Sequence, residues 1–315
     1  MTHKILQAGR LAPALETRLS QAFDTTLLWQ QADPADFVKT HGAEFDIVVT
    51  NASAGASAAL MDSLPGLKAI CSFGVGYDTI DLPAARARGV VVSNTPDVLN
   101  DCVADLAMGL LIDAARGLSA HDRFVRRGDW RHGQAGLNTR VSGKRLGLLG
   151  LGRIGQAIAR RAAGFDMDVR YHTRNVVAAS TLVHEPSLLQ LAGWADFLVV
   201  ACAGGPSTRG LVSREVIGAL RPEAFLVNVA RGSVIDEPAL VEALQQGRIA
   251  GAGLDVFADE PVVPDALLGL DNVVLLPHVA SGTRETRQAM ADLVFENVSR
   301  FAADGQLVTP IAAGR

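Results

Sequence analysis

Short apolar runs alternate along this chain with longer, alanine-rich amphipathic stretches. The apolar runs are rich in Val, Ile and Leu, as strands buried on both faces are, and the stretches between them have the length of crossover helices. Such an alternation is typical of βαβ units that build a parallel sheet. The pattern therefore predicts an α/β fold.

The first series of these runs predicts one open α/β domain at the start of the chain. Its strands are expected near residues 5–7, 47–50, 69–72 and 90–93. A long helix is expected from residue 101 to about residue 116, because apolar residues recur there at helical spacing. This helix leads out of the first domain.

A second series of runs follows, again with the spacing of βαβ crossovers. Its strands are expected near residues 146–149, 169–171, 197–201, 225–228, 251–256 and 273–276. A final helix over residues 284–303 leads into a tail that is too short to form a domain and must pack on an earlier part of the chain. We therefore expect a discontinuous domain of residues 1–99 and 285–315, and a continuous domain of residues 100–284.

Charge and cysteine content argue against several classes of protein. Lys and Arg number 29 and Asp and Glu 33, whereas a protein that binds nucleic acid through its phosphates carries a basic excess. The three cysteines lie far apart, which argues against a disulfide framework and a structural zinc site. The apolar runs are too short to cross a bilayer, and the start lacks a signal peptide. We expect a cytoplasmic protein that binds no nucleic acid, no membrane and no metal.

A glycine-rich sequence opens the second series. Gly150-Leu-Gly-Arg-Ile-Gly155 follows an apolar strand and begins a helix, the context in which G-x-G-x-x-G is typical of a dinucleotide site. Gly150 permits a tight turn, Gly152 lets the pyrophosphate approach the backbone, and Gly155 lets helix and strand pack closely. The phosphates then meet the helix N-terminus, so we expect Arg153 and Ile154 to border the cofactor. The alternative is an ordinary turn after a strand.

The end of the next strand indicates which dinucleotide binds. An NAD site has an acid there, about 20 residues after the glycines, to hold the ribose. This strand instead ends in Tyr-His-Thr-Arg-Asn, and Asp166 and Asp168 precede it. Thr173 and Arg174 can donate hydrogen bonds to a 2′-phosphate, and His172 is expected to line the adenosine pocket. We therefore expect NADPH, with NADH used less well; the alternative for Arg174 is a solvated loop arginine.

One histidine is distinguished by its position. His278 follows the strand predicted over residues 273–276 and a proline, so it lies at the carboxyl end of a strand. Ligands bind at this end in open α/β sheets. A buried structural histidine fits the same position, and position alone does not decide between the two.

Five segments of the chain resemble the D-isomer-specific 2-hydroxyacid dehydrogenase family. Residues 228–232 (NVARG), 253–261 (GLDVFADEP) and 276–283 (LPHVASGT) look like its three signature blocks, and residues 72–78 and 141–155 match it in the same order. Within the family the chain is most similar to NADPH-dependent glyoxylate/hydroxypyruvate reductases. The resemblance implies two Rossmann-like, doubly wound parallel-sheet domains with the active site in the cleft between them. The discontinuous domain would bind the substrate and the continuous one the dinucleotide.

The resemblance assigns the chemistry to Arg231, Glu260 and His278, and physical reasoning agrees. Reduction of a 2-keto acid needs a hydride at the carbonyl carbon, a proton at its oxygen and a group that holds the carboxylate. His278 can supply the proton near neutral pH, and a contact with Glu260 favours its protonated form. Arg231 presents a planar fork that can hold the carboxylate and polarise the ketone. The alternatives are a structural ion pair for Arg231 and a surface acid for Glu260.

The resemblance also implies a set of residues around these three. The backbone of Val75 and Gly76 would hold the substrate carboxylate, and the turn of Asn51 and Ser53 would close over it. Asp255 would bind the nicotinamide carboxamide. The other residues expected to border the cofactor, besides His278 itself, are Pro206, Thr208, Val229, Ala230 and Ser281. Near Pro206 this chain departs from the family pattern: it has Ala-Gly-Gly-Pro-Ser-Thr where the family often has Leu-Pro-Leu-Thr.

The function implied is NADPH-dependent reduction of glyoxylate or hydroxypyruvate to glycolate or D-glycerate. Two alternatives stay open: a dehydrogenase for another 2-keto acid, and a dinucleotide-sensing binding protein of the corepressor kind, since one fold serves several functions. The complete Arg, Glu and His set argues against the second. Phosphoglycerate dehydrogenase is disfavoured, because 315 residues leave no room for an added regulatory domain.

The chain is expected to form a homodimer. The helix predicted from residue 101 carries more apolar residues than one face against its own sheet requires, and the loop after it places Trp130 on a polar arm. In the related reductases this region forms a two-fold dimer, in which an aromatic residue can approach the neighbouring substrate pocket. Trp130 is the candidate for this role here, and a solvated loop with one buried anchor is the alternative.

Overall fold

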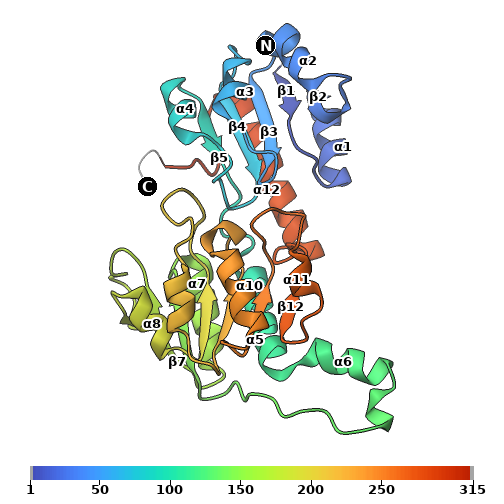
Figure 1. The fold of residues 1–315 in the computed structure, drawn as a ribbon. Coiled ribbons are helices and arrows are strands. Elements are labelled where there is room, and N and C mark those ends of the chain that lie inside the picture. The colour runs from blue at the N-terminus through green and yellow to red at the C-terminus, as the bar shows by residue number, and fades with distance from the viewer. Residues whose placement is uncertain (1–2, 313–315) are drawn as a thin grey trace. The chain divides into compact units, whose positions relative to one another are not determined.

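The computed structural model describes residues 3–312, which group into two compact units. Unit 1 is made of residues 3–99 and 282–312, and unit 2 is Asn100–Ser281. Both units are parallel sheets flanked by helices, so the predicted α/β class with two doubly wound sheets is confirmed (Figure 1). Within residues 3–312, no helix is long and apolar enough to cross a membrane.

Unit 1 contains a five-stranded sheet in which every neighbouring pair is parallel. The strand order is β2-β1-β3-β4-β5, so the winding reverses between β1 and β3. The strands are β1 (Lys4–Gln7), β2 (Asp24–Leu27), β3 (Ile47–Asn51), β4 (Ala69–Phe73) and β5 (Val91–Ser93). The four predicted strands are confirmed, whereas the polar edge strand β2 was missed.

Helices from both ends of the chain cover the sheet of unit 1. They are α1 (Pro13–Ala22), α2 (Pro34–His41), α3 (Ala58–Asp62), α4 (Leu82–Ala87), α12 (Arg284–Asp304) and the short 3₁₀ turns η1 (Leu28–Gln30) and η2 (Gly42–Glu44). The predicted C-terminal helix is confirmed as α12, which packs against β4 and α1 (Figure 1). There Arg18 forms an ion pair with Asp292, and its guanidinium carbon lies 4.0 Å from the ring centroid of Phe295.

Unit 2 contains a seven-stranded, all-parallel sheet in the order β12-β11-β10-β9-β6-β7-β8. The strands are β6 (Arg145–Leu149), β7 (Asp168–His172), β8 (Val183–His184), β9 (Phe197–Val200), β10 (Phe225–Asn228), β11 (Gly251–Leu254) and β12 (Val273–Leu275). All six predicted strands are confirmed, and the two-residue β8 was missed. The winding reverses between β6 and β9, where the carboxyl ends of strands form the ligand site of such sheets.

The helices of unit 2 include the long helix predicted from residue 101, which is confirmed as α5. They are α5 (Asn100–Arg116), α6 (Leu118–Arg126), α7 (Arg153–Ala163), α8 (Leu188–Trp194), α9 (Arg214–Ala219), α10 (Glu237–Gln245), α11 (Asp265–Leu268) and the 3₁₀ turns η3 (Asp129–Arg131) and η4 (Gly232–Val234). Helix α5 packs against α7, β10 and β11. Gly253 of β11 makes this packing close, because a Cβ there would lie 3.0 Å from the Cβ of Leu110.

Candidate active site

The glycine-rich segment forms the turn between β6 and α7. Gly150 has a φ of 102°, and a Cβ there would lie 2.7 Å from the backbone N of Cys202, two residues after the end of β9. A Cβ at Gly155 would lie 2.2 Å from the carbonyl oxygen of Gly150, so the helix can approach its own turn only without a side chain. Apart from Gly152 itself and its two chain neighbours, no atom of the described residues lies within 4 Å of a Cβ built on Gly152. Protein atoms thus fill the space at Gly150 and Gly155, whereas the space at Gly152 suits a pyrophosphate.

The turn after β7 carries the residues predicted to distinguish NADPH from NADH. Arg174 is exposed on this turn, one residue beyond Thr173. The Thr173 hydroxyl donates to the carbonyl oxygen of Asn175 at 2.7 Å, so it shapes the turn and would have to leave that bond to reach a phosphate. His172 is half-buried, and its Nδ1 lies 2.9 Å from the carbonyl oxygen of Glu185.

The predicted pair of His278 and Glu260 is formed. The Nδ1 atom of His278 lies 2.7 Å from Oε2 of Glu260, while Oε1 of Glu260 accepts a hydrogen bond from the backbone N–H of Phe257 at 3.1 Å. The His278 side chain is 40% exposed, which excludes the alternative of a buried structural histidine. Glu260 therefore fixes the orientation of an imidazole that is open to a ligand.

Asp255 holds the backbone turn on which His278 stands. This aspartate is fully buried, and its two carboxylate oxygens accept hydrogen bonds from the backbone N–H groups of Val279 at 2.7 Å and Ala280 at 2.9 Å. His278 itself has a φ of 53°, and its N–H donates to the carbonyl oxygen of Asp255 at 2.8 Å. These bonds stabilise a left-handed conformation that is unfavourable for a histidine. The predicted contact of Asp255 with the carboxamide stays a prediction.

Burial also changes the acidity of Asp255. Desolvation raises the pKa of its carboxyl above the ordinary value, against the opposing effect of the hydrogen bonds from Val279 and Ala280 and of the charge of His278. The nearby carboxylate of Glu260 raises the pKa further. A buried group that needs several donors to stay ionised is typical of functional sites.

Arg231 lies on the turn between β10 and η4. Asn228, the last residue of β10, determines this turn: its Oδ1 accepts from the Ala230 N–H and its Nδ2 donates to the carbonyl oxygen of Arg231, both at 3.0 Å. The Nη1 atom of Arg231 donates to the carbonyl oxygen of Ala230 at 2.8 Å. The buried Asn228 was not predicted as a site residue, although a polar residue that ends an apolar strand is a signal for one.

The turn of Arg231 packs directly on the segment that leads to Glu260. A Cβ at Gly232 would lie 1.8 Å from the carbonyl carbon of Phe257 and 2.3 Å from the backbone N of Ala258. Glu237 strengthens the contact, since its Oε1 accepts from the Ala258 N–H at 2.9 Å. Because β10, β11 and β12 are neighbours in the sheet, Arg231, Glu260 and His278 come from adjacent strand ends of one unit.

Besides Arg231, the residues predicted to bind the substrate lie in unit 1, at the carboxyl end of β3 and after β4. Asn51 Oδ1 accepts from the backbone N–H of Ser53 at 2.9 Å, which closes the turn after β3. The carbonyl oxygen of Val75, next to Gly76, accepts from Nδ2 of Asn94 at 2.8 Å. The sequence analysis does not predict Asn94 as a site residue, although Asn94 is polar and directly follows the strand predicted over residues 90–93.

The remaining predicted cofactor residues lie at strand ends of unit 2. The Thr208 hydroxyl donates to the carbonyl oxygen of Ala203 at 2.8 Å and so shapes the loop of Pro206. Val229 and Ala230 are buried directly after β10, and Ser281 is half-buried shortly after His278. The backbone of Cys202 also lies near the glycine turn. Burial raises the pKa of its thiol to about 11, so the thiol is protonated near neutral pH.

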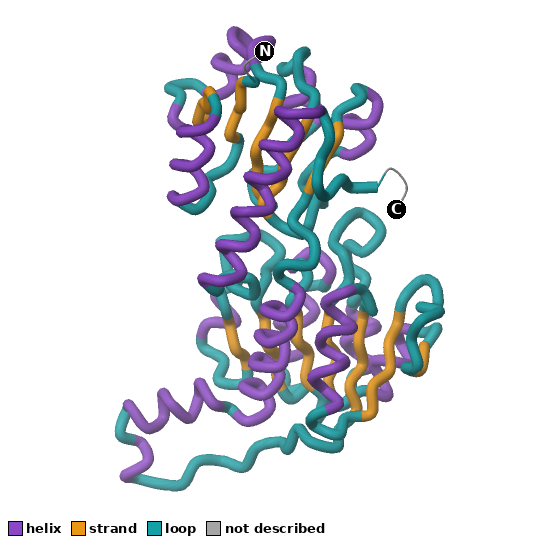
Figure 2. Tube along the Cα trace, turned by 180° about the vertical axis from the view of Figure 1, so that it is seen from behind, coloured by secondary structure: helices purple, strands orange, loops and turns teal. Residues whose placement is uncertain are grey.

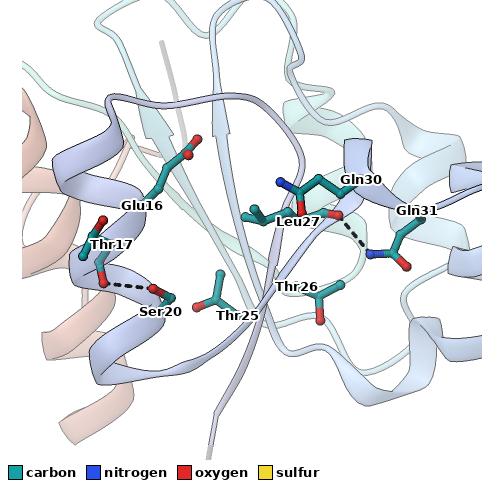
Figure 3. A pocket seen from close by; sticks show the side chains of 8 residues that line it. All are labelled: Glu16, Thr17, Ser20, Thr25, Thr26, Leu27, Gln30 and Gln31. Carbon is teal, nitrogen blue, oxygen red and sulfur yellow. Dashed lines mark hydrogen bonds between the residues drawn. The ribbon is translucent and has the colours of Figure 1, made fainter.

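A separate hollow of about 510 Å³ lies in unit 1 between α1, β2 and η1 (Figure 3). Eight residues line it: Glu16, Thr17, Ser20, Thr25, Thr26, Leu27, Gln30 and Gln31. Its acid, Glu16, accepts hydrogen bonds from Gln7 Nε2 and from the Leu11 N–H. Its lining includes no predicted site residue, and in residues 3–312 no group of three or more His, Cys, Asp or Glu could hold a metal ion.

Comparisons with known proteins relate the chain to one enzyme family. Residues 108–280 match the family model of the D-isomer specific 2-hydroxyacid dehydrogenase NAD binding domain. Hydroxyphenylpyruvate reductase of Plectranthus scutellarioides is 46% identical over 307 residues, 98% of each chain. Glyoxylate/hydroxypyruvate reductase A of Arabidopsis thaliana is 45% identical over 307 residues, again 98% of each.

A solved structure of a similar protein covers almost the whole chain. It is the NADPH-dependent glyoxylate/hydroxypyruvate reductase of Sinorhizobium meliloti in complex with NADP and malonate. The TM-score is 0.93 at 43% identity, and the match covers 99% of this chain and 97% of that one. The similarity therefore extends over both units.

Proposed function

The chain belongs to the D-isomer-specific 2-hydroxyacid dehydrogenase family, and we propose that it uses NADPH to reduce glyoxylate or hydroxypyruvate to glycolate or D-glycerate. The observation that carries the proposal is the pair of Glu260 and His278, held at 2.7 Å beside the strand end that bears Arg231. A paired and exposed imidazole supports catalysis rather than dinucleotide sensing alone. The predicted position of the site between the two domains stays a prediction.

The three side chains divide the reaction among them. Glu260 engages Nδ1 of His278, so Nε2 is the atom that donates the proton to the ketone oxygen. Arg231 binds the substrate carboxylate with its fork and orients the ketone. When bound, the cofactor supplies the hydride to the carbonyl carbon. The product then leaves as the 2-hydroxy acid, and His278 takes up a proton from solvent.

The residues around the glycine turn fit a dinucleotide. The open space at Gly152 lies directly before the N-terminus of α7, where backbone N–H groups and the helix dipole favour a phosphate. Arg153 and Ile154 form the first turn of this helix. The turn of Thr173 and Arg174 would hold the 2′-phosphate, in line with the NADP that the similar S. meliloti enzyme binds.

The substrate is tested with a panel of 2-keto acids and both cofactors. Glyoxylate and hydroxypyruvate should give the highest kcat/KM with NADPH. Hydroxyphenylpyruvate belongs in the panel, because the 46% identical relative from Plectranthus scutellarioides is a hydroxyphenylpyruvate reductase. A clear preference for the aromatic substrate would replace the proposed substrate while leaving the proposed chemistry intact.

Cofactor preference is expected to depend on Arg174. If it binds the 2′-phosphate, kcat/KM with NADPH should exceed that with NADH by ~10-fold or more, a difference of about 1.4 kcal/mol. Arg174→Asp should narrow or reverse this ratio, because a carboxylate repels the phosphate. Steady-state kinetics with both cofactors measure the ratio, and equal use of both by the parent enzyme would contradict the prediction.

We also propose a two-fold homodimer, supported by the exposed apolar residues of α6 and the segment after it. Every residue of α6 is at least partly exposed, and Leu118, Val125, Trp130 and Leu137 present apolar side chains to solvent. In two opposite views α6 and this segment extend away from the sheet of unit 2 (Figures 1 and 2). Exposed apolar side chains that gather on one segment favour an interaction surface. The proposed dimer brings the cofactor domains together and places Trp130 at the neighbouring active site.

Light scattering at micromolar concentration should give about twice the chain mass of 33.1 kDa. Val125→Arg, which puts a charge on the apolar side of α6, should shift the protein toward a monomer. Loss of activity in that monomer would support a contribution of Trp130 to the neighbouring site. A fully active monomer of the parent protein would refute the dimer and the role of Trp130.

A cytoplasmic location is part of the proposal. Cys71 and Cys202 are free thiols, as expected in a reducing compartment. Burial raises the pKa of Cys71 to about 12, which also protects it from oxidation.

A further inference from the structure

We propose that His184 is a positioning residue for cofactor choice: it holds the turn that presents Arg174 and thereby sets the preference for a dinucleotide with a 2′-phosphate. The inference rests on the proposed use of NADPH. It concerns β8, the two-residue edge strand that the sequence did not reveal.

His184 is bonded to the first residue of the turn. Its Nε2 lies 3.0 Å from the carbonyl oxygen of Thr173, which directly precedes Arg174. A carbonyl oxygen only accepts hydrogen bonds, so Nε2 carries the proton and donates. In the opposite direction, Nδ1 of His172 donates to the carbonyl oxygen of Glu185 at 2.9 Å. The two histidines thus tie β7 and β8 together beyond the two residue pairs of the strand ladder.

Ring packing fixes the orientation of His184. Its imidazole stacks on that of His172 with an interplanar angle of 11° and a centroid distance of 6.4 Å. On Tyr171 it packs at 5.1 Å and 51°. Tyr171 is itself buried, and its hydroxyl accepts a hydrogen bond from the Val177 N–H at 3.1 Å. A ring held in this way keeps its donor directed at Thr173.

The turn is therefore anchored on both sides of Arg174. His184 holds it at Thr173, and Tyr171 holds it at Val177. Between these anchors the Thr173 hydroxyl donates to Asn175, which tightens the turn further. A long arginine side chain loses conformational entropy when it binds a phosphate, and a fixed backbone lowers that cost.

The charges around the turn suit an anion. Residues 173–184 contain Arg174 and no Asp or Glu. The first acid after them, Glu185, accepts a hydrogen bond from the Ser187 N–H at 3.2 Å, at the start of α8. The nicotinamide, both riboses and the pyrophosphate are common to NADPH and NADH, whereas the 2′-phosphate is the group that Arg174 would bind. A displacement of Thr173 and Arg174 should therefore weaken the binding of NADPH far more than the binding of NADH.

Two substitutions distinguish the effect of the N–H donor of His184 from the effect of its aromatic ring. His184→Phe keeps an aromatic ring for the stack and removes the N–H donor, whereas His184→Gln keeps an N–H donor on a side chain of similar length. For His184→Phe we expect KM for NADPH to rise by ~5- to 10-fold, the effect of one lost hydrogen bond, with kcat and KM for NADH within twofold. His184→Gln should retain most of the affinity for NADPH.

A double-mutant cycle shows whether the effect passes through Arg174. On an Arg174→Ala background, His184→Phe should raise KM for NADPH no further, because the residue that His184 positions is gone. Full additivity of the two changes would overturn the proposal. So would an equal rise of KM for both cofactors in His184→Phe, or no rise for either.

Circular dichroism and thermal unfolding establish that the variants are folded, and His184→Leu replaces the Phe variant if that one is not. The parent enzyme is measured first. If the parent enzyme has the same kcat/KM with NADH and with NADPH, both the proposed preference for NADPH and the proposed role of His184 are disproved. A parent that prefers NADPH, with an unchanged preference in the donor-free variant, would disprove the role of His184 alone.

Discussion

Replacing His278 by Gln is expected to lower kcat by ~10²-fold or more while the affinity for NADPH survives. Gln keeps much of the volume of the imidazole and can still bond to Glu260, but it cannot transfer a proton. The loss should therefore appear in kcat rather than in the KM for the cofactor. Steady-state kinetics give kcat and KM, and the fluorescence of bound NADPH gives its affinity for the enzyme.

The chain offers a matched control for this substitution. His41 also pairs with a glutamate, since its Nδ1 lies 2.9 Å from Oε1 of Glu44. His41 ends α2 and Glu44 lies in η2, so both precede the amino end of β3 in unit 1. His41→Gln should leave kcat unchanged. If His278→Gln retained activity within a few-fold of the parent, another group would have to protonate the product, and the role of Glu260 would be lost with that of His278.

The strands that could be predicted are those buried in the sheets. β9 and β10 are apolar at every residue but the final asparagine and are fully buried, so their sequences carry a clear signal. β2 reads Asp-Thr-Thr-Leu and is partly exposed at a sheet edge, where little apolar area is needed. β8 has two residues and lies at an edge of the other sheet. Both were missed because pairing with a neighbour, rather than their own composition, makes them strands.

Some features of the candidate site could likewise be predicted from the sequence, and others could not. The positions of Arg231 and His278 at strand ends follow from the apolar runs before them, because parallel strands bring their carboxyl ends to one edge. Other contacts join segments that lie far apart in the sequence, and a single sequence does not contain the distances between them. They are the hydrogen bonds from the turn of His278 to Asp255 and the hydrogen bond from Asn94 to Val75. The same is true of the bond from His184 to Thr173.

Gly232→Ala is expected to lower kcat/KM by ~10²-fold, although it adds one methyl group to a residue that need not touch the substrate. The φ of Gly232 lies outside the left-handed region, so alanine can adopt the backbone conformation. The methyl carbon, however, would lie 1.8 Å from the carbonyl carbon of Phe257 and 2.0 Å from its oxygen. Both are backbone atoms, which cannot rotate away, so the turn of Arg231 and the segment before Glu260 must separate.

The separation changes the site at two points. Oε1 of Glu260 is bonded to the N–H of Phe257, so a shift of Phe257 moves the carboxylate that orients His278. Arg231 moves in the opposite direction, since it is the residue next to Gly232. A displacement of ~1 Å between reacting groups is enough for a loss of ~10²-fold. We expect both a higher KM for the 2-keto acid and a lower kcat.

Gly218→Ala is the matched control. Gly218 is in α9, and beyond its chain neighbours and the backbone of its own helix no described atom lies within 4 Å of a Cβ built there. Alanine should therefore stabilise the helix by about 0.5–1 kcal/mol and leave kcat/KM unchanged. Thermal unfolding confirms that both variants are folded under assay conditions. If folded Gly232→Ala kept the kinetics of the parent, the spacing between Arg231 and Glu260 would not be what this glycine preserves, because a methyl group cannot enter that contact without changing it.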